Sequence, residues 1–518
     1  MRVRHIMLLS ILALSPQATV WGQVQIGPQG PMPPAGYKRS VRRARAADLK
    51  SFDLTLDPAA EPVPALKYSF VPGYLEQTPG NAVSFYYRAI LMFTDMQRRL
   101  PVKERKLIDQ WLKMPLDKLP LQHIRDSLHF RPVYKELKTA AYREKCDWDW
   151  RLRDQKGNGA ILFSLKDTHQ AHLLARYLVL KARVEIAQGR YDDAIETLRI
   201  GFSLARDIAR QEPLISNLIG ISIARMMCDE VRELIDAPGA PNLYWALAQL
   251  PDPLIDLRQS IRHEMAMPLI MFPFLKDAET AQRSPEQWQR LIVRAATVVE
   301  HDGTVSEQIG GKERWTIVAR ILAGYPNAKR RLMAAGYSRE QVEQMPVGQV
   351  VAIDEFHTFR MTYDAISKWV FLAQLSFPKK QRWMMEAVDN LRLGSYLTPR
   401  PDVAREVIPI ARALLPIGYL YQAIQSQVRL EAKLAGLRTL EAIRMFAVRH
   451  GPTLPNALDE IKVVPVPRSP YTGKPFPYRV QGKKAVLDIP LSETFPGELG
   501  TQYHITIAPS KPKPKPKG

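Results

Sequence analysis

The sequence predicts a mainly α-helical protein: an irregular helical array with one repeat-like hairpin, then a long helix and a small C-terminal β subdomain. Three observations support this fold class. Apolar residues recur at helical spacing over most of residues 64–450. Many of the 42 prolines fall between these amphipathic segments, where they can separate helices without interrupting them. After residue 450 the pattern changes to short stretches that are typical of strands.

The first 22 residues have the three parts of a secretory signal peptide. Arg2 and Arg4 precede the mainly apolar run Ile6–Leu14, and Val20-Trp21-Gly22 supplies residues that are tolerated at a cleavage site. The apolar run is shorter than the roughly 20 residues that a membrane span requires. We therefore expect cleavage before Gln23, export to the periplasm or beyond, and a mature chain without a transmembrane segment.

The remaining chain divides by composition into four segments. Residues 23–63 are rich in Gly, Pro and basic side chains and predict a flexible arm. Residues 64–415 predict a helical domain, and residues 416–508 predict a long helix with a small β subdomain. Residues 509–518 form a Lys-Pro tail, which should extend as polyproline II.

Helix periodicity and breaker residues predict the individual elements. Thr78-Pro79 is read as the start of the first helix, and prolines such as Pro268 and Pro326 are expected at joints between helices. Helices are expected at 83–100, 102–113, 133–144, 168–188, 191–211, 213–236, 285–300, 348–376, 380–391, 401–414 and 418–450. Strands are expected at 476–480, 485–489 and 502–508.

The clearest local pattern is the pair of amphipathic segments within residues 168–211. Ala182, Ala194 and Gly201 supply small side chains where two antiparallel helices must approach closely. Together with the turn Gly189-Arg190-Tyr191-Asp192-Asp193-Ala194, their spacing resembles the tetratricopeptide repeat. The resemblance implies a helical hairpin with a groove-forming surface. A shift of 34 residues finds no second copy, so one repeat-like hairpin is expected.

A second resemblance lies in the string Ser-Pro-Tyr-Thr-Gly-Lys-Pro-Phe-Pro-Tyr at residues 469–478. It is similar to the turn after the long helix in type II secretion pseudopilins, with Ser469 at the acidic position and Thr472 as an extra residue. The resemblance implies a shared local fold. It does not imply pilus assembly, because a Gly/Pro-rich arm occupies the place of a pilin's assembly helix. With the signal peptide and the hairpin, these features resemble a broad group of uncharacterised exported bacterial helical proteins.

The charge of the chain favours acidic partners. Lys and Arg number 73 against 52 Asp and Glu, which gives a net charge of +21. Because export would separate the protein from the chromosome, we expect an envelope protein or an anionic envelope polymer as partner, and no nucleic acid. The alternative is that the surplus charge serves solubility alone.

Two pairs of side chains are candidates for chemistry. Asp147 and Asp149 alternate with tryptophans, and carboxylates beside aromatic walls are common in carbohydrate sites. The alternative is a charged turn with half-buried tryptophans. His169 and His172 stand three residues apart on an expected helix, so both rings could face one metal ion. The alternative is a pair of solvated or capping histidines.

The two cysteines, Cys146 and Cys228, leave two interpretations open. An oxidising compartment would permit one disulfide between them. Cys228, however, lies on an apolar helical stripe, where an inert buried thiol is expected.

Motifs of common enzyme classes are missing from the sequence: there is no nucleophile elbow, phosphate-binding loop or dinucleotide fingerprint. We therefore expect no cofactor. The leading hypothesis is a non-catalytic interaction or scaffold protein of the bacterial cell envelope. The alternative is a hydrolase acting on an envelope polymer, with Asp147 and Asp149 at its site.

Overall fold

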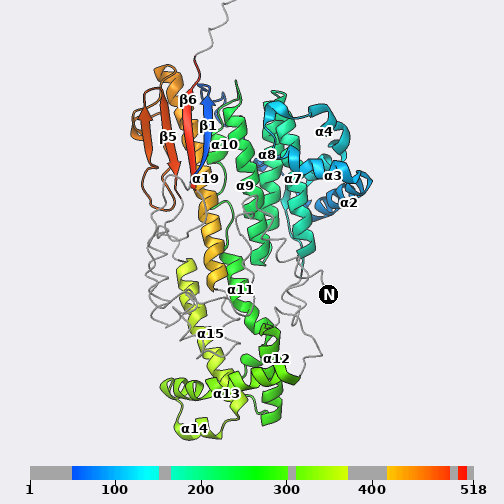
Figure 1. Ribbon diagram of the computed structural model, residues 1–518, viewed down its shortest axis with the longest axis vertical. Coiled ribbons are helices and arrows are strands. Elements are labelled where there is room, and N and C mark those ends of the chain that lie inside the picture. The colour runs from blue at the N-terminus through cyan, green and yellow to red at the C-terminus, as the bar shows by residue number, and fades with distance from the viewer. Residues whose placement is uncertain (1–48, 151–164, 301–310, 372–416, 491–499, 510–518) are drawn as a thin grey trace, which may run out of the picture. The chain divides into compact units, whose positions relative to one another are not determined.

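The computed structural model describes residues 49–150, 165–300, 311–371, 417–490 and 500–509 (Figure 1). The predicted signal peptide, most of the predicted arm, the helices expected at 380–391 and 401–414, and nearly all of the Lys-Pro tail lie outside these residues. The described part is mainly helical with a small sheet, so the predicted fold class is confirmed.

The chain forms two compact units, each built from segments that are distant in sequence. The first, which we call the β unit, comprises the described residues within Met1–Val63, Arg232–Tyr244 and Ala435–Gly518. The second, the helical unit, comprises the described residues within Pro64–Val231 and Trp245–Leu434. Two long helices, α9 (Leu214–Asp236) and α19 (Ile417–His450), contribute residues to both units.

The β unit contains a four-stranded sheet in the order β1-β6-β5-β4. The strands are β1 (Leu49–Leu56), β4 (Tyr478–Gln481), β5 (Lys484–Ile489) and β6 (Gly500–Ile507). Strand β1 runs parallel to β6, and the other neighbours are antiparallel. The three strands expected near the C-terminus are therefore present, and the β4–β5 hairpin turns at Gly482 with φ of 62°.

Strand β1 corrects the prediction that residues 23–63 form a flexible arm, because residues 49–56 are part of the sheet. Leu54 and Leu56 are buried, and Phe52 packs against Tyr503 of β6 with ring centroids 6.1 Å apart. The alternation Phe52, Leu54, Leu56 is the period-2 signal of a half-buried strand. The basic and Gly/Pro-rich composition of the preceding residues concealed it.

The C-terminal half of α19 packs on this sheet at a close approach. A β-carbon added to Gly436 would lie 2.9 Å from Cδ1 of Ile489, so glycine at this position lets the helix pack closely against the Ile489 side chain of β5. Leu437 and Leu440, which follow on the same helix, are fully buried. A long helix followed by short strands is the arrangement that the sequence predicts for this part of the chain.

The helical unit begins with a layer of short elements and continues with longer helices. Its helices are α2 (Val83–Arg99), α3 (Val102–Trp111), α4 (Leu121–Leu128), α5 (Arg131–Ala141), α7 (Leu165–Ala187), α8 (Tyr191–Ala209), α11 (Arg258–Met271), α12 (Pro285–Glu300), α13 (Gly311–Ala334), α14 (Arg339–Gln344) and α15 (Val347–Phe371). Strands β2 (Thr78–Asn81) and β3 (Arg143–Lys145) pair in parallel. The short helices are α10 (Tyr244–Ala248), η3 (Tyr74–Glu76), η4 (Leu116–Lys118) and η6 (Pro273–Leu275). A further short helix, η7 (Leu458–Glu460), belongs to the β unit.

Three predictions based on proline were wrong. Thr78-Pro79 lies in β2, and the first helix begins only at Val83. Pro268 and Pro326 lie inside α11 and α13, not between helices. Proline removes one backbone donor and disfavours a helix interior, but packing of the helix on both sides can offset that cost. Helices α11 and α13 were missed for this reason.

Helices α7 and α8 form the expected hairpin, with Gly189 at its turn in a left-handed conformation, φ 69°. Ala182 and Ala194 are fully buried. Gly201 faces the next helix instead: a β-carbon there would lie 2.0 Å from Sδ of Met227 on α9. Thus Gly201 sets the spacing between α8 and α9 rather than between the two helices of the hairpin.

Candidate binding cavity

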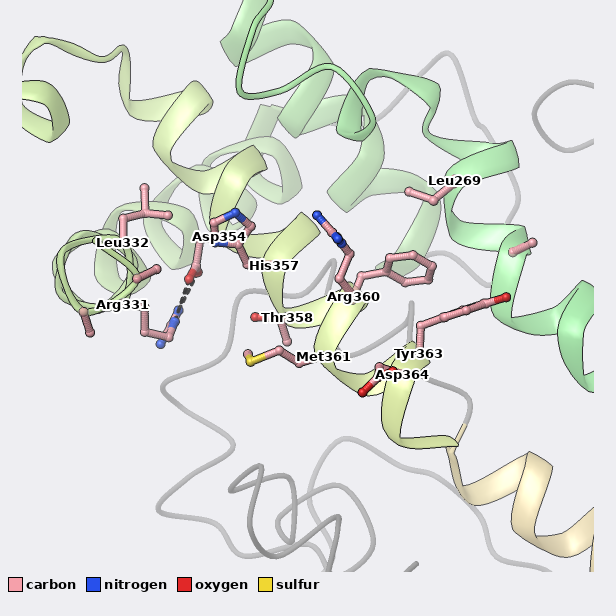
Figure 2. Close-up of a pocket in the computed structure, with 14 residues that line it drawn as sticks. Leu269, Arg331, Leu332, Asp354, His357, Thr358, Arg360, Met361, Tyr363 and Asp364 are labelled. Atoms are coloured by element: carbon pink, nitrogen blue, oxygen red, sulfur yellow. Dashed lines mark hydrogen bonds and ion pairs between the residues drawn. The ribbon is translucent and has the colours of Figure 1, made fainter. Parts of the chain in front are cut away.

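A cavity of about 1010 Å³ lies in the helical unit between α11, α13 and α15 (Figure 2). The core beneath it holds α13 and α15 in place, because Leu332 and Val350 are both buried in one cluster around Trp288. Another close approach supports this core: a β-carbon on Gly348 would lie 2.7 Å from Cβ of Trp288. The residues lining the cavity are Ala266, Leu269, Arg331, Leu332, Ala334, Ala335, Asp354, His357, Thr358, Phe359, Arg360, Met361, Tyr363 and Asp364.

One wall of the cavity carries a bidentate ion pair between Arg331 and Asp354. Arg331 donates from Nε and Nη2 to the two carboxylate oxygens of Asp354, at 2.7 and 2.6 Å. The Asp354 side chain is 5% exposed, whereas that of Arg331 is 44% exposed. Figure 2 shows this pair joining α13 to α15 at one side of the cavity. Because both oxygens of Asp354 are occupied, this carboxylate is placed to orient Arg331 rather than to accept a proton from a substrate.

His357 is held from outside the cavity. Its Nε2 lies 2.7 Å from Oε1 of Glu279, and its ring lies 6.1 Å from that of Tyr337. Partial burial raises the pKa of the Tyr337 hydroxyl, and the Glu279 carboxylate raises it further, so Tyr337 stays protonated. These contacts fix the orientation of the imidazole.

The rest of the lining combines apolar surface with exposed polar groups. Phe359 is 4% exposed and forms part of the floor, whereas Met361 is 52% exposed. In Figure 2, Tyr363 extends from α15 toward the helix that carries Leu269. A mostly apolar concavity with a few oriented polar groups is the usual form of a ligand site. Since Glu279 engages Nε2 of His357 and Arg331 engages Asp354, the lining is better suited to binding than to proton transfer.

Asp147 and Asp149 lie elsewhere in the helical unit, in the segment after β3. Both aspartates are exposed, whereas Trp148 and Trp150 are each 8% exposed. Trp148 stacks on Tyr86 at 5.8 Å and donates its indole N–H to the backbone oxygen of Asp207 at 3.2 Å. The carboxylates thus face solvent while the aromatic rings are buried, so the two kinds of side chain do not share one surface. The arrangement matches the alternative interpretation, a charged turn anchored by tryptophans.

We expect the double substitution Asp147→Asn/Asp149→Asn to change the unfolding free energy by less than about 0.5 kcal/mol. An asparagine side chain at position 147 could still accept the 3.0 Å hydrogen bond from the amide of residue 149. Asp149 has φ of 44°, which asparagine tolerates and a β-branched residue does not. The matched control, Asp149→Val, should therefore be destabilised by about 1–2 kcal/mol. Urea unfolding measures both, and equal effects would contradict this account.

His169 and His172 both lie on α7, as predicted. His172 is 3% exposed, and neither of its ring nitrogens has a hydrogen-bond partner among the residues that the structure describes. Burial lowers its pKa to about 4, with smaller effects from Arg176 and His169, so it is neutral at pH 7. Burial likewise lowers the pKa of His169. Within the described ranges, no three His, Cys, Asp or Glu side chains gather closely enough to hold a metal ion.

Both cysteines are free thiols in the structure. Cys228 is fully buried on α9, as the apolar stripe predicted, and burial raises its pKa to about 12. Burial also raises the pKa of Cys146, whose Sγ lies 4.0 Å from the backbone oxygen of Asp207. The two sulfurs have separate surroundings in the structure, and no disulfide joins them there.

These features define the class of protein: a mainly helical chain with a small mixed sheet and a partly apolar cavity in its helical unit. No family model, curated protein or solved structure matches the chain. None of the helices in the described ranges is long and apolar enough to cross a membrane.

The cavity was not predicted from the sequence. Its walls come from α11 and α13, which contain the prolines that were read as joints, and from α15, which was predicted. The charged pair Arg331 and Asp354 is separated by 23 residues and belongs to no motif. The one available signal was the i, i+3 spacing of Asp354, His357 and Arg360, which places polar groups on one face of α15.

Proposed function

We propose that this chain is a non-catalytic interaction or scaffold protein of the bacterial cell envelope, and that it holds its partner in the cavity between α11, α13 and α15. The observation that carries the proposal is the cavity itself, where a fixed Arg331–Asp354 pair borders apolar surface from Phe359 and Met361. Its volume is large enough for several apolar side chains of a partner segment. Placement in the envelope rests on the signal peptide that the N-terminal sequence predicts.

The chemistry of the lining also supports binding by a partner segment. Arg331 retains 44% exposure after pairing with Asp354, so part of its guanidinium can still meet a backbone carbonyl or a carboxylate of the partner. Met361 offers a flexible, polarisable side chain, which suits a surface that must adapt to a partner. Polar groups that are already oriented reduce the entropy cost of binding.

A photocrosslinking experiment tests this proposal in cells. A benzophenone amino acid replaces Met361, which lines the cavity, and in a separate protein it replaces Met333, which is 39% exposed on α13 but does not line it. We expect a discrete crosslinked product from position 361 alone. The product should be lost when Ala335→Trp places an indole ring in the cavity, and should persist in Asp147→Asn/Asp149→Asn. The same products from both positions, or a product that survives Ala335→Trp, would overturn the proposal.

A further inference from the structure

The exposed faces of α2 and α3 carry an unusual combination of apolar and basic side chains. Leu91 is 69% exposed and Met92 is 41% exposed on α2, and Val102 is 60% exposed at the start of α3. Figure 1 places α2 and α3 at the margin of the helical unit. We call the following residues the α2–α3 surface: Leu91, Met92, Arg98, Arg99, Val102, Lys103, Arg105 and Lys106.

Helix geometry brings the two kinds of side chain together. Leu91 and Arg98 are seven residues apart on α2, so they lie on one face about 10 Å apart. On α3, Val102 and Lys106 are four residues apart and also share a face. Only Leu100 and Pro101 separate the two helices, so the cations from Arg98 to Lys106 gather at one corner.

The positive charge at this corner is mostly uncompensated. Glu104 is the only carboxylate between residues 98 and 106, and it turns inward: its Oε2 lies 2.8 Å from Nε2 of His123 and accepts a hydrogen bond from Ser127. Arg99 pairs with Asp95. Within the part of the chain that the structure describes, the other four cations have no ion-pair partner: Arg98, Lys103, Arg105 and Lys106.

We infer that the α2–α3 surface binds an anionic lipid bilayer in its interfacial region. Lysine and arginine around exposed aliphatic side chains are what a peripheral helix needs: the cations meet lipid phosphates, and the aliphatic groups enter the boundary between headgroups and acyl chains. An acidic polysaccharide would satisfy the cations but would leave Leu91 and Val102 in water. The apolar component therefore favours a lipid surface. The inference does not depend on what the cavity binds.

Vesicle co-sedimentation of the full mature chain tests the inference. The probes are phosphatidylcholine vesicles with and without phosphatidylglycerol, and we expect binding to those with phosphatidylglycerol. Each cation near the surface contributes about fivefold to the partition coefficient, so Arg98→Glu/Lys103→Glu/Lys106→Glu should lower binding by at least about a hundredfold. Leu91→Ser/Val102→Ser, which leaves the charge intact, should lower it by about tenfold.

The control has the same change in charge at exposed positions outside the α2–α3 surface: Arg330→Glu/Arg339→Glu/Lys483→Glu. It should retain binding within about fivefold, because it leaves every cation and every aliphatic side chain of the α2–α3 surface in place. Circular dichroism confirms folding of every variant. Equal losses in the control and the α2–α3 variant would overturn the inference, as would binding that neither variant affects. Full binding by Leu91→Ser/Val102→Ser would also overturn it, because the aliphatic side chains would then contribute nothing to binding.

Discussion

Replacing Arg444 with alanine is expected to destabilise the β unit by about 3–5 kcal/mol. Arg444 and its partner Glu441 are both fully buried on α19, with Nη1 of Arg444 3.0 Å from Oε2 of Glu441. The guanidinium also donates to the backbone oxygens of Asp57, Pro241 and Ala240. Alanine would leave a buried carboxylate without its counter-ion and would remove the donors for three carbonyl groups.

These contacts join three separate parts of the β unit. Asp57 directly follows β1, and residues 240–241 follow α9, so one side chain on α19 holds both segments. The amide of Gly239 donates in turn to the carboxylate of Asp57 at 2.7 Å. Loss of Arg444 should therefore loosen β1 first, because its end is bound to α19 through this guanidinium.

Hydrogen exchange is the appropriate measurement, since it reports on the β unit separately from the rest of the chain. Peptides covering 49–56 and 500–507 should lose protection in Arg444→Ala. The matched control is Arg449→Ala, an exposed position on the same helix, which should change protection by less than about 0.5 kcal/mol. Arg444→Lys keeps the positive charge but not the planar guanidinium group, so its loss of protection should lie between those of Arg444→Ala and Arg449→Ala. Unchanged exchange in Arg444→Ala would contradict this account.

Glu431→Gln is expected to change the pH dependence of stability. Burial raises the pKa of this carboxyl to about 7; the Leu254 amide, which donates to Oε1 at 2.8 Å, opposes the shift, and Asp252 adds to it. In the unfolded chain the pKa is near 4.5. Between these two values the folded state binds the extra proton, so raising the pH destabilises the fold.

The stability that the protonated Glu431 carboxyl contributes to the wild type is fully present below pH 4.5 and is lost as the pH rises through 7. Between about pH 5 and pH 8 the free energy of unfolding of the wild type should therefore fall by roughly 2–3 kcal/mol, because one unit of pKa shift corresponds to about 1.4 kcal/mol. Glutamine does not titrate and can still accept the bond from Leu254. The stability of Glu431→Gln relative to wild type should therefore rise by that amount over this interval.

Urea unfolding at pH 5 and pH 8 measures this difference. The control is Glu340→Gln, at an exposed position on α14, whose effect should be the same at both values of pH. If the free energies of unfolding of wild type and Glu431→Gln differ by the same amount at both values of pH, the carboxyl does not titrate near neutrality in the folded protein.

The sequence predicted the helices whose apolar pattern is local and uninterrupted. Helix α9 was expected at 213–236 and α12 at 285–300, and both were found within one residue. Such helices bury a continuous stripe, so periodicity alone reveals them. Helices α11 and α13 were missed because a single proline outweighed the periodic pattern around it.

The candidate site depended far less on local pattern. The alternation of Asp147 and Asp149 with tryptophans predicts a candidate carbohydrate site, but the same alternation leaves the carboxylates in solvent and the rings in the interior. Arg331 and Asp354 meet because α13 and α15 pack together around Trp288. The sequence around either residue does not indicate that they form a pair. Glu431 owes its high pKa to burial, which no neighbour in the sequence indicates.

By itself, then, the sequence determined the helical class, the hairpin of α7 and α8, and the strands after the long helix, because hydrogen bonds and apolar periodicity along a segment depend on that segment alone. Tertiary structure decided that β1 joins the sheet beside β6, although β1 ends at Leu56 and β6 begins only at Gly500. It also decided which polar groups are buried together: Arg444 with Glu441, and Arg331 with Asp354. Burial and charge pairing arise from distant segments, and they set both the stability of the β unit and the chemistry of the cavity.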